Sequence, residues 1–416
     1  MDEIKKIINY AYENSQFYKE LYNKSGINLE LLANNEQITK YLPIVSKENL
    51  RDNLDLIVID KFKFVKSKNI QSVYTSGSTG LMVEIKWLKD DYYKSNIELW
   101  RKRKKWYNIN ANSKKIDFHG IVYWGSRLAK TPKITYKNNN RTLSLSKFHF
   151  LTEDILEYYK EITEFNPDWM SIQPSLILKM IDVFENYNLK PFPTLKYIEL
   201  NGEVVTEFAK KRIKSFFNIP IANMYGANEV NGIALECPNG HMHILEQNVF
   251  VDIRKDNHNN NTILVTSLKN TVTPIINYDL GDLVELDYID CKCGERGRIV
   301  KIISGRIVDM INIDEKHMIN PYIFSFAIEK INSIFDDPIL EFKILQNDND
   351  KIIMLLKVKK EFKNWKKTIE EELLNILQEI KEIEILKIEI VFVENIPLIG
   401  NKFKIFEKGK YVHDKW

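Results

Sequence analysis

The sequence predicts an α/β protein with a large N-terminal domain of helix-covered mixed sheets and a small, mobile C-terminal α+β domain. Its 416 residues are too many for one ordinary core, which favours two or three domains. Strand and helix patterns alternate between Asp154 and Met224, which is typical of a parallel sheet covered by helices. After Gly305-Arg306 the pattern changes to a hairpin, a charged amphipathic helix and a strand, which can form a second core.

The N-terminal third begins with helical patterns. Apolar residues from Ile4 to Leu21 recur at roughly helical spacing, and another long helix is expected from Asp91 to Trp106. The alternating region follows, and Thr206 is expected to cap its last helix. Its expected helices are 155–165, 174–184 and 206–217, and its expected strands are 168–172, 197–200 and 219–224.

The remaining elements place the domain boundary. Antiparallel strands are expected on either side of two turn-rich segments, KDNHNNN and NDND, and a helix and a strand complete the C-terminal unit. We therefore predict an N-terminal domain over residues 1–304, a hinge over 305–312 and a C-terminal lid domain over 313–416. The expected elements are strands 250–253 and 262–267, hairpin strands 340–345 and 352–358, helix 363–381 and strand 385–393.

Composition argues against several classes of protein. Sixty basic and fifty-seven acidic side chains leave a net charge of +3, which gives no electrostatic reason to expect a nucleic-acid partner. We find no apolar run of the roughly eighteen residues that a membrane span needs, and the charged N-terminus does not look like a signal peptide. Three cysteines cannot form a disulfide framework, so a cytoplasmic location is expected.

A tight polar turn is the first candidate binding site. Thr75-Ser76-Gly77-Ser78-Thr79-Gly80 lies between two β-prone runs and uses two of the chain's fifteen glycines. Glycine lets a backbone approach another group closely, and hydroxyl and N–H groups are hydrogen-bond donors. The turn therefore suits an anion such as phosphate, and a polar hairpin loop is the alternative.

Two candidate sites follow strands of the alternating region. Glu203 ends the Asn201-Gly202-Glu203 turn, and open α/β sheets bind ligands at such strand ends. Tyr225-Gly226-Ala227-Asn228-Glu229 follows the next strand, and its glycine would let the chain turn beneath a ligand. The Glu229 carboxylate could hold Mg²⁺, which takes oxygen ligands alongside phosphate.

Three charged residues nearer the C-terminus are further candidates. Asp282 follows a glycine in Tyr278-Asp279-Leu280-Gly281-Asp282, and its carboxylate could bind the two hydroxyls of a ribose. Arg306 lies at the domain boundary, where a guanidinium group can grip phosphate or lock a hinge. Lys402, in Gly400-Asn401-Lys402, could act as a mobile cation, and Lys404 competes for this role.

The cysteines predict a zinc site. Cys237 opens the segment Cys-Pro-Asn-Gly-His-Met-His, and Cys291 and Cys293 follow some fifty residues later. Three cysteines with either His241 or His243 supply four ligands for a closed tetrahedral Zn²⁺ site. Free buried thiols are the alternative. Since four protein ligands leave no open position, the ion should be structural.

Taken in order, these motifs resemble those of the adenylate-forming enzymes, specifically the phenylacetate–coenzyme A ligase-like group and its capsule-biosynthesis branch. The segments NYAYENSQFYKELYNKSGI and LPIVSKENLRDN resemble that group's N-terminal region. The segment SLSKFHFLTEDILEYYKEITEFNPDWMSIQPSLI resembles the middle of the capsule branch. The resemblance spans essentially the whole chain.

The resemblance implies an ATP- and Mg²⁺-dependent ligase. It would activate a small carboxylic acid as an acyl-adenylate and pass the acyl group to coenzyme A or to an amine, while the C-terminal domain swings about the hinge. The resemblance to zinc-bearing members of the group implies that the metal-binding histidine is His243. The implied site residues are Ser76 to Gly80 for phosphate, Glu203 for the adenine side, Tyr225 and Gly226 for the base and acyl pocket, Asp282 for ribose, Glu229 for Mg²⁺, Arg306 and Lys402 for phosphate charge, and His119, Tyr123 and Trp124 for the acyl pocket.

The sequence departs from the family pattern at four places, one of which is the closing lysine, since Lys402 follows Asn401 and not a glycine. Leu81 and Met82 replace the lysine and proline that usually follow the phosphate loop, and Val308 replaces the usual hinge acid. Residues 314–317, DEKH, replace a glycine-containing turn that lets pantetheine pass in coenzyme A ligases, which favours an amine acceptor. A nucleotide-binding protein of the same fold without turnover is the alternative function. The acid and the oligomeric state are not predicted.

Overall fold

The structure is a computed structural model of the chain. For a few residues, among them Tyr123, Trp124 and Arg306, it describes the backbone alone. The described residues are 2–29, 38–63, 69–74, 83–119, 123–124, 127–128, 132–147, 149–150, 152–255, 260–306, 311–312, 318–319, 323–335, 338–347, 350–379, 383, 386–396 and 406–408.

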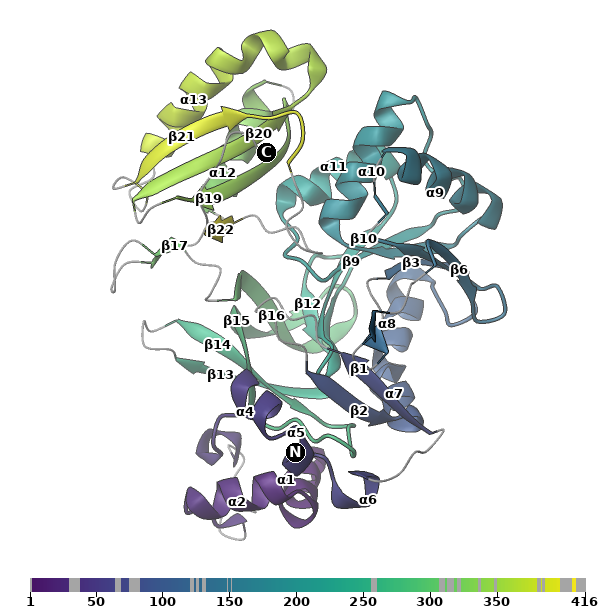
Figure 1. Cartoon of the computed structure of the whole chain (residues 1–416), viewed down its shortest axis with the longest axis vertical. Coiled ribbons are helices and arrows are strands. Elements are labelled where there is room, and N and C mark those ends of the chain that lie inside the picture. The colour runs from purple at the N-terminus through teal and green to yellow at the C-terminus, as the bar shows by residue number, and fades with distance from the viewer. Residues whose placement is uncertain are drawn as a thin grey trace.

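A twelve-stranded mixed sheet forms the centre of the large domain (Figure 1). Strands β7, β3, β8, β9 and β10 run parallel to one another, and the remaining pairs are antiparallel. In spatial order the strands are β13 (Val249–Lys255), β14 (Asn261–Ser267), β15 (Tyr278–Cys291), β16 (Glu295–Arg306), β12 (Met242–Ile244), β11 (Asn231–Glu236), β10 (Ile221–Ala227), β9 (Tyr197–Asn201), β8 (Trp169–Ile172), β3 (Lys115–His119), β7 (Thr142–Ser146) and β6 (Ile134–Lys137).

Helices cover both faces of the parallel strands. Side chains alternate between the faces of a strand, so Met170 and Ile198 point to one core while Trp169 and Tyr197 point to the other. The first core lies beneath α9 (Thr152–Phe165), α10 (Pro174–Asn186) and α11 (Glu207–Phe217). The second lies beneath α8 (Ile97–Tyr107), which follows α7 (Lys89–Ser95).

A buried ion pair ties α8 to the centre of the sheet. The Arg103 guanidinium donates two hydrogen bonds to the Glu199 carboxylate, at 2.7 and 2.6 Å. Glu199 is fully buried on β9, and Arg103 also lies over the rings of Trp100 and Trp169. This contact fixes β9, whose end carries the predicted ligand-binding turn.

The N-terminal helices pack on the antiparallel half of the sheet. Tyr18 is fully buried there, and its hydroxyl donates to the Pro274 carbonyl at 3.0 Å. Trp87 of a separate hairpin enters the same core. The elements are α1 (Asp2–Asn14), α2 (Gln16–Lys24), η1 (Ile38–Tyr41), α4 (Lys47–Asp52), α5 (Leu54–Ile57), α6 (Asp60–Lys63) and the hairpin β1 (Ile70–Tyr74) and β2 (Glu84–Leu88); a second small hairpin is β4 (Tyr123–Trp124) and β5 (Arg127–Leu128).

A four-stranded sheet, ordered β21-β20-β19-β22, with two helices forms the small domain (Figure 1). Its core includes Phe324, Met354 and Leu373, and all of its described members lie at or after Ile311. The exact domain limits stay a prediction. The elements are β17 (Ile311–Asn312), β18 (Met318–Ile319), α12 (Ile323–Ile334), β19 (Ile339–Gln346), β20 (Lys351–Val358), η3 (Lys360–Trp365), α13 (Lys366–Gln378), β21 (Lys387–Phe392) and β22 (Phe406–Lys408).

The predicted fold class is confirmed, but two predicted helices are interrupted. Ser15 adopts an extended conformation between α1 and α2, and its hydroxyl donates to the Leu56 carbonyl at 3.0 Å. Asn96 separates α7 from α8, because its side-chain amide bonds back to the Tyr92 carbonyl at 2.8 Å. None of the helices that the structure describes combines the length and apolar character needed to cross a bilayer.

Candidate active site

The carboxyl ends of β8 and β9 carry the first predicted site residue. The Glu203 carboxylate accepts hydrogen bonds from the backbone N–H of Ser175 at 3.0 Å and from its hydroxyl at 2.8 Å. Ser175 lies in the first turn of α10, directly after β8, and Gly202 makes the turn after β9 with a φ of +77°. Glu203 is therefore held at the sheet edge where open α/β folds bind ligands.

Two predicted residues that are far apart in the sequence meet beside β10. The Tyr225 hydroxyl donates to the Asp282 carboxylate at 2.6 Å. Asp282 in turn lies opposite Arg306 in the antiparallel pairing of β15 with β16. The structure therefore brings Tyr225, Asp282 and the backbone of Arg306 together.

Glu229 is buried in the turn after β10. It is 4% exposed, and its carboxylate accepts a hydrogen bond from the Tyr278 hydroxyl at 3.2 Å. Among the residues that the structure describes, no basic side chain forms an ion pair with Glu229. A buried carboxylate with only a neutral donor is costly unless a cation lies nearby. This environment fits the predicted Mg²⁺ ligand.

The strand that leads into the predicted phosphate loop ends beside the same segment. The side-chain amide of Asn228 donates to the backbone carbonyl of Tyr74 at 2.7 Å. Tyr74 ends β1 and directly precedes Thr75. Residues 75–80 themselves lie outside the described part of the chain, so their role stays a prediction.

Gly226 has no room for a side chain. A Cβ atom there would lie 2.7 Å from the Asn231 backbone oxygen and 3.3 Å from the Met224 sulfur. Gly226 lies at a register shift between β10 and β11, so that oxygen cannot move without disturbing the strand pairing.

Gly226→Ala is therefore expected to lower the free energy of unfolding by about 1–3 kcal/mol, which is a typical cost of overpacking. Denaturant unfolding followed by circular dichroism measures the change. Gly297→Ala is the matched control, because the nearest atom to its added Cβ lies 4.0 Å away. Equal losses in the two variants would show that the close approach at Gly226 carries no cost.

His119 ends β3 at the same edge of the sheet and bonds to its own chain through both ring nitrogens. Nδ1 lies 3.0 Å from the Ser144 hydroxyl, and Nε2 lies 3.1 Å from the Pro132 carbonyl. Because a carbonyl only accepts, we assign the proton to Nε2. Burial, with the nearby charge of Lys137, lowers the pKa of His119 and favours the neutral ring. Its contact with substrate stays a prediction.

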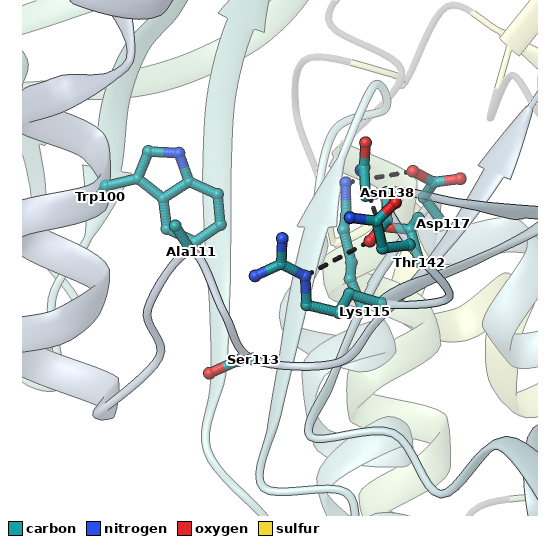
Figure 2. A pocket seen from close by; sticks show the side chains of 9 residues that line it. Trp100, Ala111, Ser113, Lys115, Asp117, Asn138 and Thr142 are labelled. Carbon is teal, nitrogen blue, oxygen red and sulfur yellow. Dashed lines mark hydrogen bonds and ion pairs between the residues drawn. The ribbon is translucent and has the colours of Figure 1, made fainter.

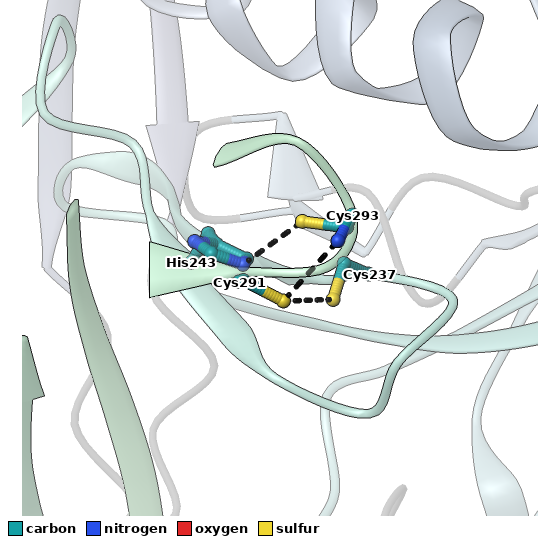
Figure 3. A group of neighbouring side chains, drawn as sticks. All are labelled: Cys237, His243, Cys291 and Cys293. Atoms are coloured by element: carbon teal, nitrogen blue, oxygen red, sulfur yellow. Dashed lines mark hydrogen bonds between the residues drawn. The ribbon is translucent and has the colours of Figure 1, made fainter. Parts of the chain in front are cut away.

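The three cysteines converge with His243 (Figure 3). Their ligand atoms all lie within 4.8 Å of one another. Cys237 follows β11, His243 lies on β12, and Cys291 and Cys293 lie at the turn between β15 and β16. The second predicted histidine, His241, also approaches, with Nδ1 3.2 Å from the Cys291 sulfur, but it is exposed whereas His243 is 2% exposed.

The separations in this cluster fit one tetrahedral ion. The sulfurs of Cys237 and Cys291 are 3.8 Å apart, and the Cys293 sulfur lies 3.3 Å from Nε2 of His243. Two thiolates bound to Zn²⁺ at about 2.3 Å in tetrahedral geometry would be roughly 3.8 Å apart. Burial, together with the charge of Lys102, lowers the pKa of His243 to about 4, so its ring is neutral near pH 7 and able to bind metal.

Helix α8 grips the turn that carries two of the cysteines. Glu295 pairs with Lys105 at 2.6 Å and with Lys102 at 3.1 Å. Lys105 also donates to the Gly294 carbonyl at 3.1 Å, and the Trp106 ring lies 5.5 Å from that of His243. The cluster is therefore packed against the helix that Arg103 fastens to β9.

Comparisons with known proteins identify relatives of the chain. No family model matches the chain. Protein CapK of Staphylococcus aureus is 25% identical over 357 residues, which cover 84% of this chain and 75% of CapK. A phenylacetate-coenzyme A ligase of Thermus thermophilus is 22% identical over 331 residues, which cover 75% of this chain and 70% of that enzyme. The chain is a homologue of both.

The fold is that of the adenylate-forming ligases. A 2-hydroxyisobutyryl-CoA ligase, solved in its postadenylation state with 2-HIB-AMP, has a TM-score of 0.75 at 17% identity and covers 98% of this chain and 88% of its own. The same ligase in its thioesterification state has a TM-score of 0.60 at the same identity and coverage. The predicted family resemblance is confirmed.

Several residues that the adenylate-forming resemblance implies lie outside the description. These include Lys402 and its competitor Lys404, while of Tyr123, Trp124 and Arg306 only the backbone is described. Sequence reasoning also missed two contacts at the site. Ser175 holds Glu203, and Asn228 holds the end of β1. The signal for Ser175 was its place after Pro174, at a helix start that faces the strand ends.

A hollow of about 530 Å³ lies on the large domain, at the start of strands β3 and β7 (Figure 2). Its lining includes Lys115 and Thr142, which begin β3 and β7, whereas His119 ends β3. Figure 2 shows Trp100 on the opposite side from these strand residues. None of the predicted site residues whose side chains the structure describes lines this hollow, so it is separate from the described part of the candidate active site.

Proposed function

We propose that the chain is an ATP-dependent ligase that activates a small carboxylic acid as an acyl-adenylate and transfers the acyl group to coenzyme A or to an amine. The observation that carries this proposal is the meeting of Tyr225, Asp282 and the Arg306 backbone beside β10. Buried Glu229 lies on the segment that follows β10, and Asn228 of the same segment donates a hydrogen bond to the end of β1. The adenylate-forming fold of the chain supports the same reaction class.

In the first step a carboxylate oxygen attacks the α-phosphorus of ATP, and pyrophosphate leaves with the electron pair of the broken P–O bond. We assign phosphate binding to residues 75–80, ribose binding to Asp282, and the adenine and acyl sides to Glu203 and Tyr225. Bound Mg²⁺ would offset the phosphate charge, and Glu229 is the residue we assign to it. Arg306 and Lys402 would stabilise the charge that develops at phosphorus.

The acceptor is the open part of this proposal. Coenzyme A is supported by the names of the related ligases, whereas an amine is supported by DEKH at residues 314–317. Release of AMP that depends on added coenzyme A or on an added amine distinguishes the two.

We also propose that Cys237, His243, Cys291 and Cys293 hold a structural Zn²⁺, since four protein ligands leave no position for substrate.

Pyrophosphate exchange with a panel of carboxylic acids tests the proposal. At least one acid is expected to support exchange of labelled pyrophosphate into ATP, and Lys402→Ala is expected to abolish it. Leu81, Met82 and Val308 stand where the family usually has a lysine, a proline and an acidic hinge residue. These differences favour a second candidate, a nucleotide-binding protein of the same fold without turnover. ATP binding without exchange for any acid would favour that candidate and contradict the ligase.

A further inference from the structure

Four charged side chains meet where the two domains touch. Lys357 on β20 of the small domain lies 2.7 Å from the Asp182 carboxylate on α10 of the large domain. Arg212 on α11 lies 2.8 Å from the other oxygen of Asp182, and Glu341 on β19 lies 3.2 Å from the Lys357 amine. Figure 1 shows α10 and α11 on the side of the large domain nearest to β19 and β20.

Water is largely excluded from this cluster. The side chains of Asp182 and Arg212 are 7% and 12% exposed, and those of Lys357 and Glu341 are 18% and 15% exposed. Partly desolvated pairs attract more strongly than surface pairs, whose contribution is usually small. The contact between Lys357 and Asp182 should therefore influence how the domains are arranged.

Each charge at the interface has a second partner within its own domain. If the domains separate, Asp182 keeps Arg212, and Lys357 keeps Glu341. Separation then leaves none of these four charges unpaired. An unpaired buried charge is what makes the loss of a buried ion pair costly. Such a contact can form and break repeatedly at modest cost.

We propose that Asp182 and Lys357 form a reversible latch that positions the small domain for adenylate formation and releases it for acyl transfer. This inference rests on the proposed function. The whole chain matches the postadenylation state of 2-hydroxyisobutyryl-CoA ligase with a TM-score of 0.75 and its thioesterification state with 0.60. Identity and coverage are equal in both comparisons. We therefore infer from the higher score that the two domains lie closer to the arrangement of the postadenylation state. Asp182 and Lys357 are positioning residues that contact no reacting atom.

Energy transfer between dyes on the two domains tests the latch directly. The dyes are attached through encoded azido residues at exposed Tyr187 and Trp365. Labelling through cysteine is avoided, because it would modify the three cysteines of the proposed zinc site. Lys357→Gln and Asp182→Asn are each expected to shift the transfer efficiency by a similar amount. Lys351→Gln, which breaks a pair with Glu389 inside the small domain, is expected to leave it unchanged.

The double variant Asp182→Asn with Lys357→Gln provides the sharper readout. Because both substitutions remove the same contact between the domains, the double variant should shift the transfer efficiency no further than either single variant. Unchanged efficiency in the single variants, or additive shifts in the double, would overturn the latch. These outcomes need no turnover, so they decide the latch even if pyrophosphate exchange fails for every acid.

The half-reactions give the functional readout in the full-length protein. Lys357→Gln is expected to lower kcat for pyrophosphate exchange about tenfold with little change in KM for ATP, because fewer molecules hold the competent arrangement. Consumption of preformed acyl-adenylate by the acceptor should be unchanged or faster. A merely structural pair would instead lower thermal stability and slow both half-reactions equally, and that result would overturn the proposal.

Discussion

Glu229→Gln is expected to slow adenylate formation about 100- to 1,000-fold, which is the usual cost of removing one preorganised electrostatic group. The amide keeps an oxygen that can accept the hydrogen bond from Tyr278, so the local fold should survive. What is lost is the negative charge that we assign to Mg²⁺. Pyrophosphate exchange, measured across a range of Mg²⁺ concentrations, should show both a lower rate and a higher Mg²⁺ requirement.

Glu236→Gln is the matched control for this prediction. Glu236 is also a buried carboxylate, 5% exposed, but it pairs with Lys210 and accepts from the Asn223 backbone. Its replacement should reduce stability without changing the Mg²⁺ requirement. If Glu229→Gln reduced exchange no more than Glu236→Gln and left the Mg²⁺ dependence intact, the metal assignment of Glu229 would be wrong.

The alternating region could be predicted because local sequence decides its elements. The strand predicted at 197–200 is β9 (Tyr197–Asn201), and Thr206 caps α11 by accepting from the Ala209 N–H at 3.1 Å. The breaks at Ser15 and Asn96 could not be predicted in this way. The Ser15 hydroxyl bonds to Leu56, 41 residues away, so only the tertiary structure fixes where α1 ends.

The candidate site likewise combines features that local sequence predicts with contacts that only the tertiary structure determines. Motifs were enough to single out glycine turns and carboxylates at strand ends as candidate site residues, since these features have a local signature. They did not predict that Tyr225 bonds to Asp282, because 57 residues and the β15–β16 register lie between them. The link between Asn228 and Tyr74 spans 154 residues and was equally invisible. Such contacts depend on strand order, which the sequence pattern leaves open.

In the cysteine cluster, the sequence predicted the number and type of the ligands but not which histidine takes part. The sequence predicted three sulfurs and one of two histidines, but no spacing rule distinguished His241 from His243. In the structure His243 is buried on β12 beside Trp106, and its Nε2 faces Cys293. His241 is exposed in the turn before it and lies near Cys291. The pairing of β12 with β16 brings His243 to the sulfurs.

Loss of the proposed zinc ion should destabilise the large domain. Cys291→Ser is expected to abolish metal binding and to lower the free energy of unfolding by several kcal/mol, because metal binding to a site absent from the unfolded chain contributes directly to folding. Without the ion, the turn at Cys291 and Cys293 loses its link to Cys237 and His243. Metal analysis of the purified protein and denaturant unfolding measure the two effects.

Histidine variants make the zinc prediction specific. His243→Ala should lose the metal and much of the stability, whereas His241→Ala should retain both, because a tetrahedral ion needs only one of the two rings. Treating the unaltered protein with a chelator should reproduce the Cys291→Ser unfolding curve. A full complement of zinc in both Cys291→Ser and His243→Ala would place the metal elsewhere. Since Glu295 joins this turn to α8 and Arg103 joins α8 to β9, metal loss should also weaken adenylate formation without changing its Mg²⁺ requirement.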